Sequence, residues 1–229
     1  MPFFYYFDPT VLIVLPALIF TLWAQFNVNS TFEKYKRVKT TSNTTGYDAA
    51  RRILDANGLE HVAIEMIGGE LTDHYDPRAN VIRLSSAVYG SNSAAAVGVA
   101  AHEAGHAVQH AKGYFPIKVR QAIIPVTRIG SSLAMPLFLI GLIFAATPLM
   151  YLGIAFFAFA TVFQLVTLPV EFNASRRAME ALEGSGRMTS TELNASRKVL
   201  TAAALTYVAA LASSLLSLLR LIVLANRRR

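Results

Sequence analysis

The sequence contains no cysteine and little charge. Without cysteine, the 229-residue chain cannot form a disulfide framework, a cysteine-ligated zinc site or a thiol nucleophile. Charged residues make up only 15% of the chain, against roughly 25% in an ordinary soluble protein. Apolar residues make up 54% and are gathered in long runs. These features favour a protein with membrane spans over a purely soluble one.

Three long stretches are almost free of charge. The first covers Thr10 to Phe26, close to the roughly 20 residues that cross a hydrocarbon core, with Phe3 to Phe7 and Trp23 expected at the two interfaces. No basic residue precedes it and no small-residue cleavage site follows, so a membrane anchor is favoured over a signal peptide. The second, residues 129–170, is long enough for two helices hinged near Thr147 and Pro148. The third covers residues 199–226 and is interrupted by Arg220.

These stretches divide the chain into five predicted segments. They are an N-terminal transmembrane anchor (1–30), a cytosolic zinc-peptidase domain (31–128), a transmembrane helical hairpin (129–170), a second cytosolic segment (171–198) and a C-terminal membrane helix with a basic tail (199–229).

The positive charges predict the orientation in the membrane. Of the 21 lysines and arginines, 17 fall in segments 31–128 and 171–198, so both should face the cytosol and the N-terminus the outside. Their place beside apolar runs argues against nucleic-acid binding despite the net charge of +7. The arginines at 227–229 contradict this rule if the last segment spans fully; the alternatives are a re-entrant segment or one lying along the membrane. A bacterial-type plasma (inner) membrane is the expected location, and the oligomeric state is open.

Segment 31–128 has mixed local patterns. Apolar spacing predicts a helix over Tyr47 to Asn57, ended by Gly58. Val62 to Met66 is typical of a short strand, and Leu71 to Ser85 of two strands around a turn at Asp76 to Asn80. A second helix should run from Ala94 to Ala111, capped by Ser91 or Ser93.

The second helix carries the pattern HExxH. His102 and His106 are four residues apart and therefore lie on one helix face, where two imidazoles can bind one zinc ion. Glu103 would lie beside the metal, where it can take a proton from a water activated by zinc. The small residues Ala104 and Gly105 are interpreted as leaving room for substrate to approach the helix. The alternative is two solvated histidines on an ordinary helix.

A catalytic zinc ion needs a third protein ligand and leaves one position to water. The candidates are a carboxylate or one of three further histidines, His61, His74 and His110. Glu171 is favoured, because two spans separate it from His106 and return it to the same side of the membrane. The alternative is an interfacial glutamate paired with Arg176 or Arg177.

Three motifs in order carry a family resemblance: LTDHYDPRANVIRLS, HEAGHAVQH and PVEFNASRRA. Together they resemble the YugP-type neutral zinc metallopeptidases and, more distantly, the HtpX and CAAX-prenyl-protease class. The resemblance implies a helical zinc domain at the cytosolic face, Glu171 as third ligand and a role in protein quality control. In the HtpX-like class an Asp stands four residues after this Glu and supports a histidine ligand. Here the position is Ser175, so support for the histidine is expected from Ser175 or from Asp73.

Other residues are candidates for substrate binding. Leu71 to Tyr75 could form an edge strand that binds an extended peptide, with His74 or Tyr75 stabilising an oxyanion and Arg176 contacting substrate carbonyls or lipid phosphates. The alternative is that Asp73, His74 and Asp76 only build a turn before Pro77. His110 is interpreted as structural.

The sequence thus predicts a mainly α, multi-span membrane protein with a helical zincin-type metalloprotease domain, in which the HExxH helix accompanies a short β-hairpin or sheet. Its expected function is zinc-dependent hydrolysis of peptides or membrane proteins at the cytosolic face. The ligands would be His102, His106 and Glu171, with Glu103 as general base, and the lipid bilayer is the other expected partner. The alternatives are a non-catalytic metal-binding scaffold or chaperone and an intramembrane site-2-type protease.

Overall fold

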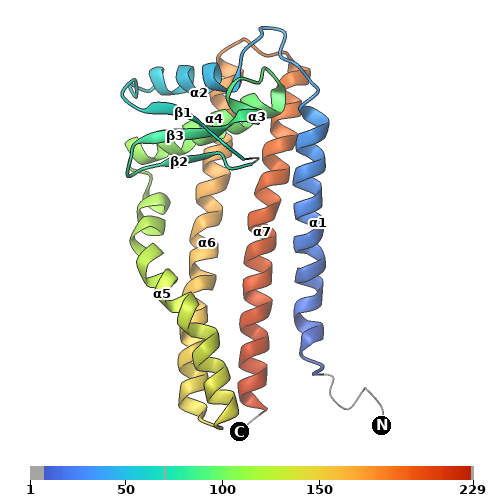
Figure 1. The fold of residues 1–229 in the computed structure, drawn as a ribbon, viewed down its shortest axis with the longest axis vertical. Coiled ribbons are helices and arrows are strands. Elements are labelled where there is room, and N and C mark those ends of the chain that lie inside the picture. The colour runs from blue at the N-terminus through green and yellow to red at the C-terminus, as the bar shows by residue number, and fades with distance from the viewer. Residues whose placement is uncertain (1–7, 70, 228–229) are drawn as a thin grey trace. The chain divides into compact units, whose positions relative to one another are not determined.

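The computed structural model describes residues 8–69 and 71–227, and Figure 1 labels its helices and strands. Phe3 to Phe7 and Arg228 and Arg229 lie outside the described residues. Four helices within the described residues are long and apolar enough to cross a membrane. They are α1 (Val11–Tyr35), α5 (Phe115–Ile143), α6 (Thr147–Gly184) and α7 (Ser190–Asn226). With one small sheet, they confirm the predicted mainly helical, multi-span fold class.

The long helices run further than the charge-free stretches. The hairpin expected over residues 129–170 forms, but α5 already begins at Phe115 and α6 continues to Gly184. A helix satisfies its own backbone hydrogen bonds, so charged side chains can prolong it beyond the apolar stretch without ending it. The break lies at 144–146, where Ala145 has a φ of 52°, one residue before the predicted hinge begins.

The last apolar segment belongs to one continuous helix. At 37 residues and about 1.5 Å per residue, α7 is long enough for a full span, which favours that alternative over a re-entrant segment. The segment expected over residues 171–198 is not separate, because it forms the end of α6 and the beginning of α7.

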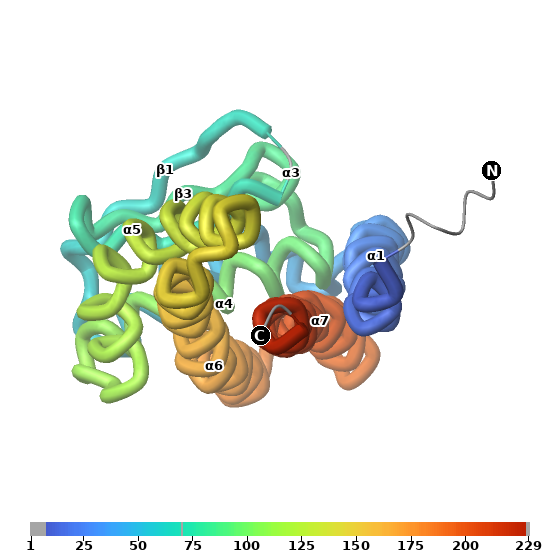
Figure 2. The backbone as a smooth tube through the Cα atoms, turned by 90° about the horizontal axis from the view of Figure 1, so that it is seen from below, coloured from blue at the N-terminus to red at the C-terminus, as the bar shows by residue number. Residues whose placement is uncertain are grey.

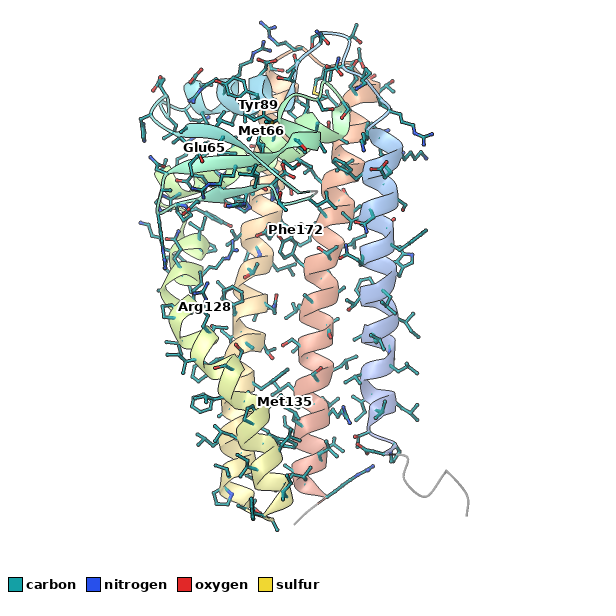
Figure 3. All side chains as sticks on the ribbon, in the orientation of Figure 1. Glu65, Met66, Tyr89, Arg128, Met135 and Phe172 are labelled. Atoms are coloured by element: carbon teal, nitrogen blue, oxygen red, sulfur yellow. The ribbon has the colours of Figure 1, made fainter. Side chains whose placement is uncertain are left out.

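The chain divides into two compact units, which are described separately. Unit 1 comprises residues 1–24, 119–168 and 206–229. Within it, parts of α5, α6, α7 and α1 follow one another side by side (Figures 1 and 2). Phe138, Met150 and Leu221 belong to its buried core, whereas many large apolar side chains, such as Met135 in Figure 3, are exposed. Exposed apolar faces of this kind suit helices surrounded by lipid.

Arg220, the charged residue within the last apolar segment, is paired in unit 1. Its guanidinium donates to Asp8 Oδ2 at 3.2 Å and to Thr10 Oγ1 at 3.1 Å. An intramembrane charge is tolerated where it pairs with an opposite charge, so this arginine has a structural explanation.

Unit 2 comprises residues 25–118 and 169–205. It contains α2 (Gly46–Asp55), β1 (Ala63–Ile67), β2 (His74–Asp76), β3 (Val81–Ser85), α3 (Ser86–Tyr89) and α4 (Ala94–Ala111). The sheet has the order β1-β3-β2, with β1 parallel and β2 antiparallel to β3. The strand prediction is confirmed to within a few residues, whereas the short helix α3 was missed.

The helix α4 lies at the centre of unit 2. It begins where predicted, because the Ser93 hydroxyl accepts a hydrogen bond from the Ala96 amide. Thirteen of its 18 residues are buried, and its many alanines allow α2 and the sheet to pack closely on it. The HExxH motif therefore lies on the helix of unit 2 that is most enclosed by its neighbours.

Candidate metal centre

Two helices bring together the three residues favoured as metal ligands. His102 and His106 project from α4, and Glu171 from the part of α6 that belongs to unit 2. Glu171 Oε2 lies 3.3 Å from His102 Nε2 and 3.4 Å from His106 Nε2. Glu171 is only 2% exposed, so its carboxylate is turned inward toward the two rings.

The spacing of these atoms fits zinc. A tetrahedral ion with ligand bonds of roughly 2.0–2.1 Å has ligand atoms about 3.3 Å apart. The two contacts to Glu171 match that separation, and all three ligand atoms lie within 4.8 Å of one another. Two imidazoles and one carboxylate are also the donor set of several catalytic zinc sites. The residues present therefore fit a zinc ion.

A glycine sets the distance between the two helices. A Cβ atom placed on Gly105 would lie 2.6 Å from the carbonyl oxygen of Ala174 on α6, closer than real contacts allow. Gly105 is buried against α6, so the interpretation that it leaves room for substrate was wrong. The absent side chain lets α6 approach α4 and carry Glu171 to the histidines.

Glu103 is held by the edge strand. Its Oε2 accepts a hydrogen bond of 2.9 Å from the amide of Tyr75 in β2, and the side chain is 8% exposed. This contact orients the carboxylate from the sheet side, and its negative charge raises the pKa of His106. Glu103 is therefore an anchored carboxylate close to the histidines.

A buried glutamine fixes the orientation of His106. The Gln109 side-chain amide donates to the Val170 carbonyl at 2.8 Å and to Asn173 Oδ1 at 3.0 Å. Its Oε1 therefore faces His106 Nδ1, 3.0 Å away, and accepts the proton on that nitrogen. The other nitrogen, Nε2, is left with a lone pair directed to the cluster, as metal binding requires.

No role for Gln109 was predicted from the sequence. The available signal was its place three residues after His106, which puts both side chains on one helix face. Its partner Asn173 also accepts a hydrogen bond of 2.8 Å from Arg177 Nε. Arg177 thus supports this network; a pair between Glu171 and Arg176 or Arg177 was only the alternative to Glu171 as a metal ligand.

His102 is supported by a serine hydroxyl, where His106 is supported by the side-chain carbonyl of Gln109. Its Nδ1 lies 3.1 Å from the Ser175 hydroxyl, which brings the predicted supporting residue to the ring. Asp73 instead accepts hydrogen bonds from the backbone amide and hydroxyl of Ser85, at 2.7 and 3.1 Å. Burial, together with the nearby charge of Glu103, raises the pKa of Asp73. Asp73 therefore positions β3 and does not contact either histidine.

The side-chain contacts of the predicted substrate-binding residues are to residues outside the metal cluster. The exposed His74 ring contacts the Thr72 carbonyl through Nδ1, and the Tyr75 hydroxyl donates to Asn80 in the following turn. Tyr75 also lies edge-on to His110, with ring centroids 6.1 Å apart. Arg176 is exposed on α6 beside Ser175, with its Nε 4.0 Å from Glu180. Neither His74 nor His110 belongs to the group of His102, His106 and Glu171 that could hold a metal ion.

The electrostatics favour a cation at the centre. Burial lowers the pKa of His106, but its contact with Glu171 and the charges of Glu103 and Glu171 outweigh burial, and the net shift is upward. A site that stabilises a protonated imidazole in this way also stabilises a metal ion in its place.

Comparison with known proteins agrees with this geometry. The model of the family described as "Putative neutral zinc metallopeptidase" matches residues 10–226. The chain belongs to this family. It is also 48% identical over 214 residues to the "Putative membrane protease YugP" of Bacillus subtilis (strain 168), an alignment that covers 93% of this chain and 95% of the relative. No solved structure matches the chain. The resemblance read from three motifs is thereby confirmed, and the family supports zinc as the metal.

Proposed function

We propose that the protein is a zinc-dependent endopeptidase that hydrolyses peptide bonds at the cytosolic face of the membrane. The observation that carries the proposal is the convergence of His102, His106 and Glu171 beside the anchored carboxylate of Glu103. The first three residues would hold the ion. Bound zinc supplies Lewis acidity and lowers the pKa of a coordinated water to roughly 7.

Glu103 has the position of a proton carrier. Its carboxylate is buried, close to the histidines and held by the Tyr75 amide. It would receive the proton of the attacking water on one oxygen and later deliver it to the leaving amine. The hydrogen bond from the Tyr75 amide occupies Oε2 and fixes the direction of the carboxylate, so the role of base rests on this geometry.

The network around Gln109 keeps His106 in the productive tautomer. A metal ligand must present Nε2 without a proton, and the acceptor Gln109 Oε1 holds that proton on Nδ1. Ser175 can do the same for His102 by accepting from its Nδ1.

The sheet offers a docking edge for an extended peptide. In the order β1-β3-β2, one edge of β2 pairs with β3 and its other edge carries the Tyr75 amide that reaches Glu103. In an antiparallel pair the amide and carbonyl of one residue point to the same edge. The Tyr75 carbonyl can therefore accept a hydrogen bond from a substrate strand added next to Glu103.

The sequence supports a cytosolic orientation. Most of the lysines and arginines fall outside the membrane-crossing stretches, as expected for segments that stay on the cytosolic side. The helix α4 is not among the four candidate spans of the described residues, which weighs against an intramembrane protease. Accessible substrates would be peptides and membrane-protein segments exposed at this surface, in keeping with a role in quality control.

A matched pair of variants tests the proposal. Purified protein is assayed for zinc content and for cleavage of an unstructured protein such as casein. Glu103→Gln should keep about one zinc ion per chain and lose cleavage by at least a hundredfold, because the amide cannot accept the proton. Glu171→Ala should lose both. Retained cleavage in Glu103→Gln would overturn the mechanism, and full zinc binding in Glu171→Ala would remove that residue from the site.

A further inference from the structure

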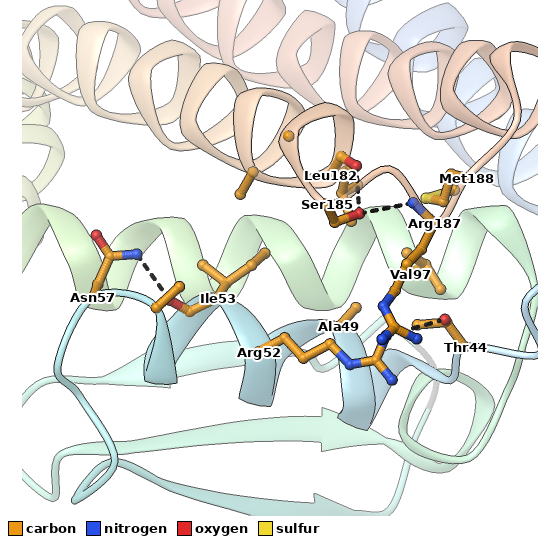
Figure 4. Close-up of a pocket in the computed structure, with 13 residues that line it drawn as sticks. Thr44, Ala49, Arg52, Ile53, Asn57, Val97, Leu182, Ser185, Arg187 and Met188 are labelled. Atoms are coloured by element: carbon orange, nitrogen blue, oxygen red, sulfur yellow. Dashed lines mark hydrogen bonds between the residues drawn. The ribbon is translucent and has the colours of Figure 1, made fainter.

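A cavity lies in unit 2, apart from the residues of the metal centre. It has a volume of about 470 Å³ and is enclosed by α2, α4, the end of α6 and the following loop (Figure 4). Its floor is apolar and is formed by Ala49, Ile53, Val97, Leu182 and Met188. None of the three candidate metal ligands lines it. The volume lies within the range of pockets that hold small organic molecules.

Two arginines stand at the edge of this cavity. Arg52 reaches it from α2 and Arg187 from the loop after α6, and in the view of Figure 4 their guanidinium groups lie at the same end, beside Thr44. Arg52 makes a long contact of 3.5 Å to the Thr44 hydroxyl. Within the described residues, neither guanidinium forms an ion pair with a carboxylate, whereas the neighbouring Arg51 pairs with Asp55 at 2.7 Å.

Two acidic side chains close in sequence to these arginines have other hydrogen-bonding partners. Asp48 accepts hydrogen bonds from Thr45, the N-cap of α2, which together with a smaller effect of the Arg52 charge lower the pKa of Asp48, and Glu183 pairs with Arg197. Both arginines are exposed, so water screens their charges, and an anion placed between them would gain two cationic partners. Guanidinium groups bind carboxylates strongly, through paired hydrogen bonds.

We propose that this cavity binds a medium-chain carboxylate, with the carboxylate between Arg52 and Arg187 and the apolar chain on the floor. The polar groups of the wall favour such a ligand over a peptide. The Asn57 side-chain amide donates to the Ile53 carbonyl, and Ser185 accepts from the Arg187 amide and donates to the Leu182 carbonyl. Few groups are left for the amides of a peptide, whose burial without partners is costly, whereas an alkyl chain needs none.

The test uses the full chain with zinc, in phosphatidylcholine nanodiscs, titrated calorimetrically with octanoate. Titration of empty nanodiscs corrects for partition into lipid. Octanoate should bind once per chain and at least tenfold more tightly than octanol, which has the same chain without the charge. N-acetyl-leucine, a carboxylate with an amide in its body, should bind more weakly than octanoate.

Variants separate the cavity from general electrostatics. Arg52→Gln and Arg187→Gln should each weaken octanoate binding roughly tenfold or more, the usual effect of losing a charge-assisted hydrogen bond. Arg78→Gln, which removes a charge from the exposed turn between β2 and β3, should leave it unchanged. Ala181→Phe, which fills the cavity, should abolish it. Zinc content and melting temperature report that each variant is folded.

Several results would overturn the proposal. Octanoate binding no tighter than that of octanol would remove the role of the arginines. Equal binding in the wild type and both arginine variants would place the ligand elsewhere, and tighter binding of N-acetyl-leucine would assign the cavity to peptide ends. The metal centre lies outside the cavity, so these results leave the proposed peptidase activity unaffected.

Discussion

Replacing Gly105 by alanine tests whether the close contact between α4 and α6 builds the metal centre. The added Cβ would stand 2.6 Å from the Ala174 carbonyl oxygen, whereas ordinary contacts begin at 3.4 Å. The carbonyl belongs to a helix backbone and cannot rotate away, so α6 must move by about 0.8 Å, the difference between these two distances. Glu171 lies three residues from Ala174 on the same helix and would move with it.

Such a shift is large for a metal site. Ligand distances must stay within about 0.2 Å of their ideal values, so one ligand displaced by several times that amount cannot coordinate well. We expect zinc affinity to fall at least tenfold, together with a destabilisation of about 1–3 kcal/mol from overpacking. Competition with a chelator of known affinity measures the first effect, and thermal unfolding the second.

A second glycine of α4 provides the matched control. A Cβ on Gly98 would meet Ser196 on α7, at 3.1 Å from that residue's Cβ, and would not press on α6. Gly98→Ala should therefore lower the melting temperature without lowering zinc affinity. Wild-type zinc affinity in Gly105→Ala would refute the reasoning, and equal losses in both variants would attribute the effect to general destabilisation.

Further predictions concern the two histidines. Gln109→Leu should weaken zinc binding about 10- to 100-fold, the usual effect of removing a partner of a ligand histidine, with retained secondary structure by circular dichroism as the control. Ser175→Asp should strengthen zinc binding, because a carboxylate holds the Nδ1 proton of His102 more firmly than a hydroxyl does. Ser175→Ala should weaken it, because the hydroxyl that contacts Nδ1 is lost. Competition with a chelator measures the order of the three zinc affinities. Acidification should release zinc. The raised pKa of His106 means that protons compete with the metal from a higher pH than at an ordinary histidine, so occupancy at limiting zinc should begin to fall above the usual titration range of that side chain. Constant occupancy down to pH 5.5 would contradict this.

Local sequence patterns were sufficient to predict several features of the structure. The apolar runs predicted the membrane helices, and Ser93 predicted the beginning of α4. The four-residue spacing of His102 and His106 placed both rings on one helix face. Each of these conclusions rests on interactions within a few residues along the chain, which a sequence displays directly.

Other features depend on residues distant along the chain. The sequence suggested an edge strand near Tyr75, but it did not predict that β1 pairs in parallel with β3, because strand order depends on which surfaces pack on α4. Gly105 was misread for the same reason, since its function is defined by Ala174, a residue of another helix. Gln109 went unassigned because its partners, Val170 and Asn173, lie more than 60 residues away.

The sequence by itself determined the membrane character, the helix that carries HExxH and the choice of residue types suited to zinc. Only the tertiary structure brought Glu171 to 3.3 Å from His102, placed the Tyr75 amide on Glu103 and left Arg52 and Arg187 at one cavity. The physical reason is that periodicity and composition report which face of an element is buried, whereas the contact between two buried faces depends on the shapes of both. Here a glycine on one helix and a backbone carbonyl on another decide whether a metal centre can form.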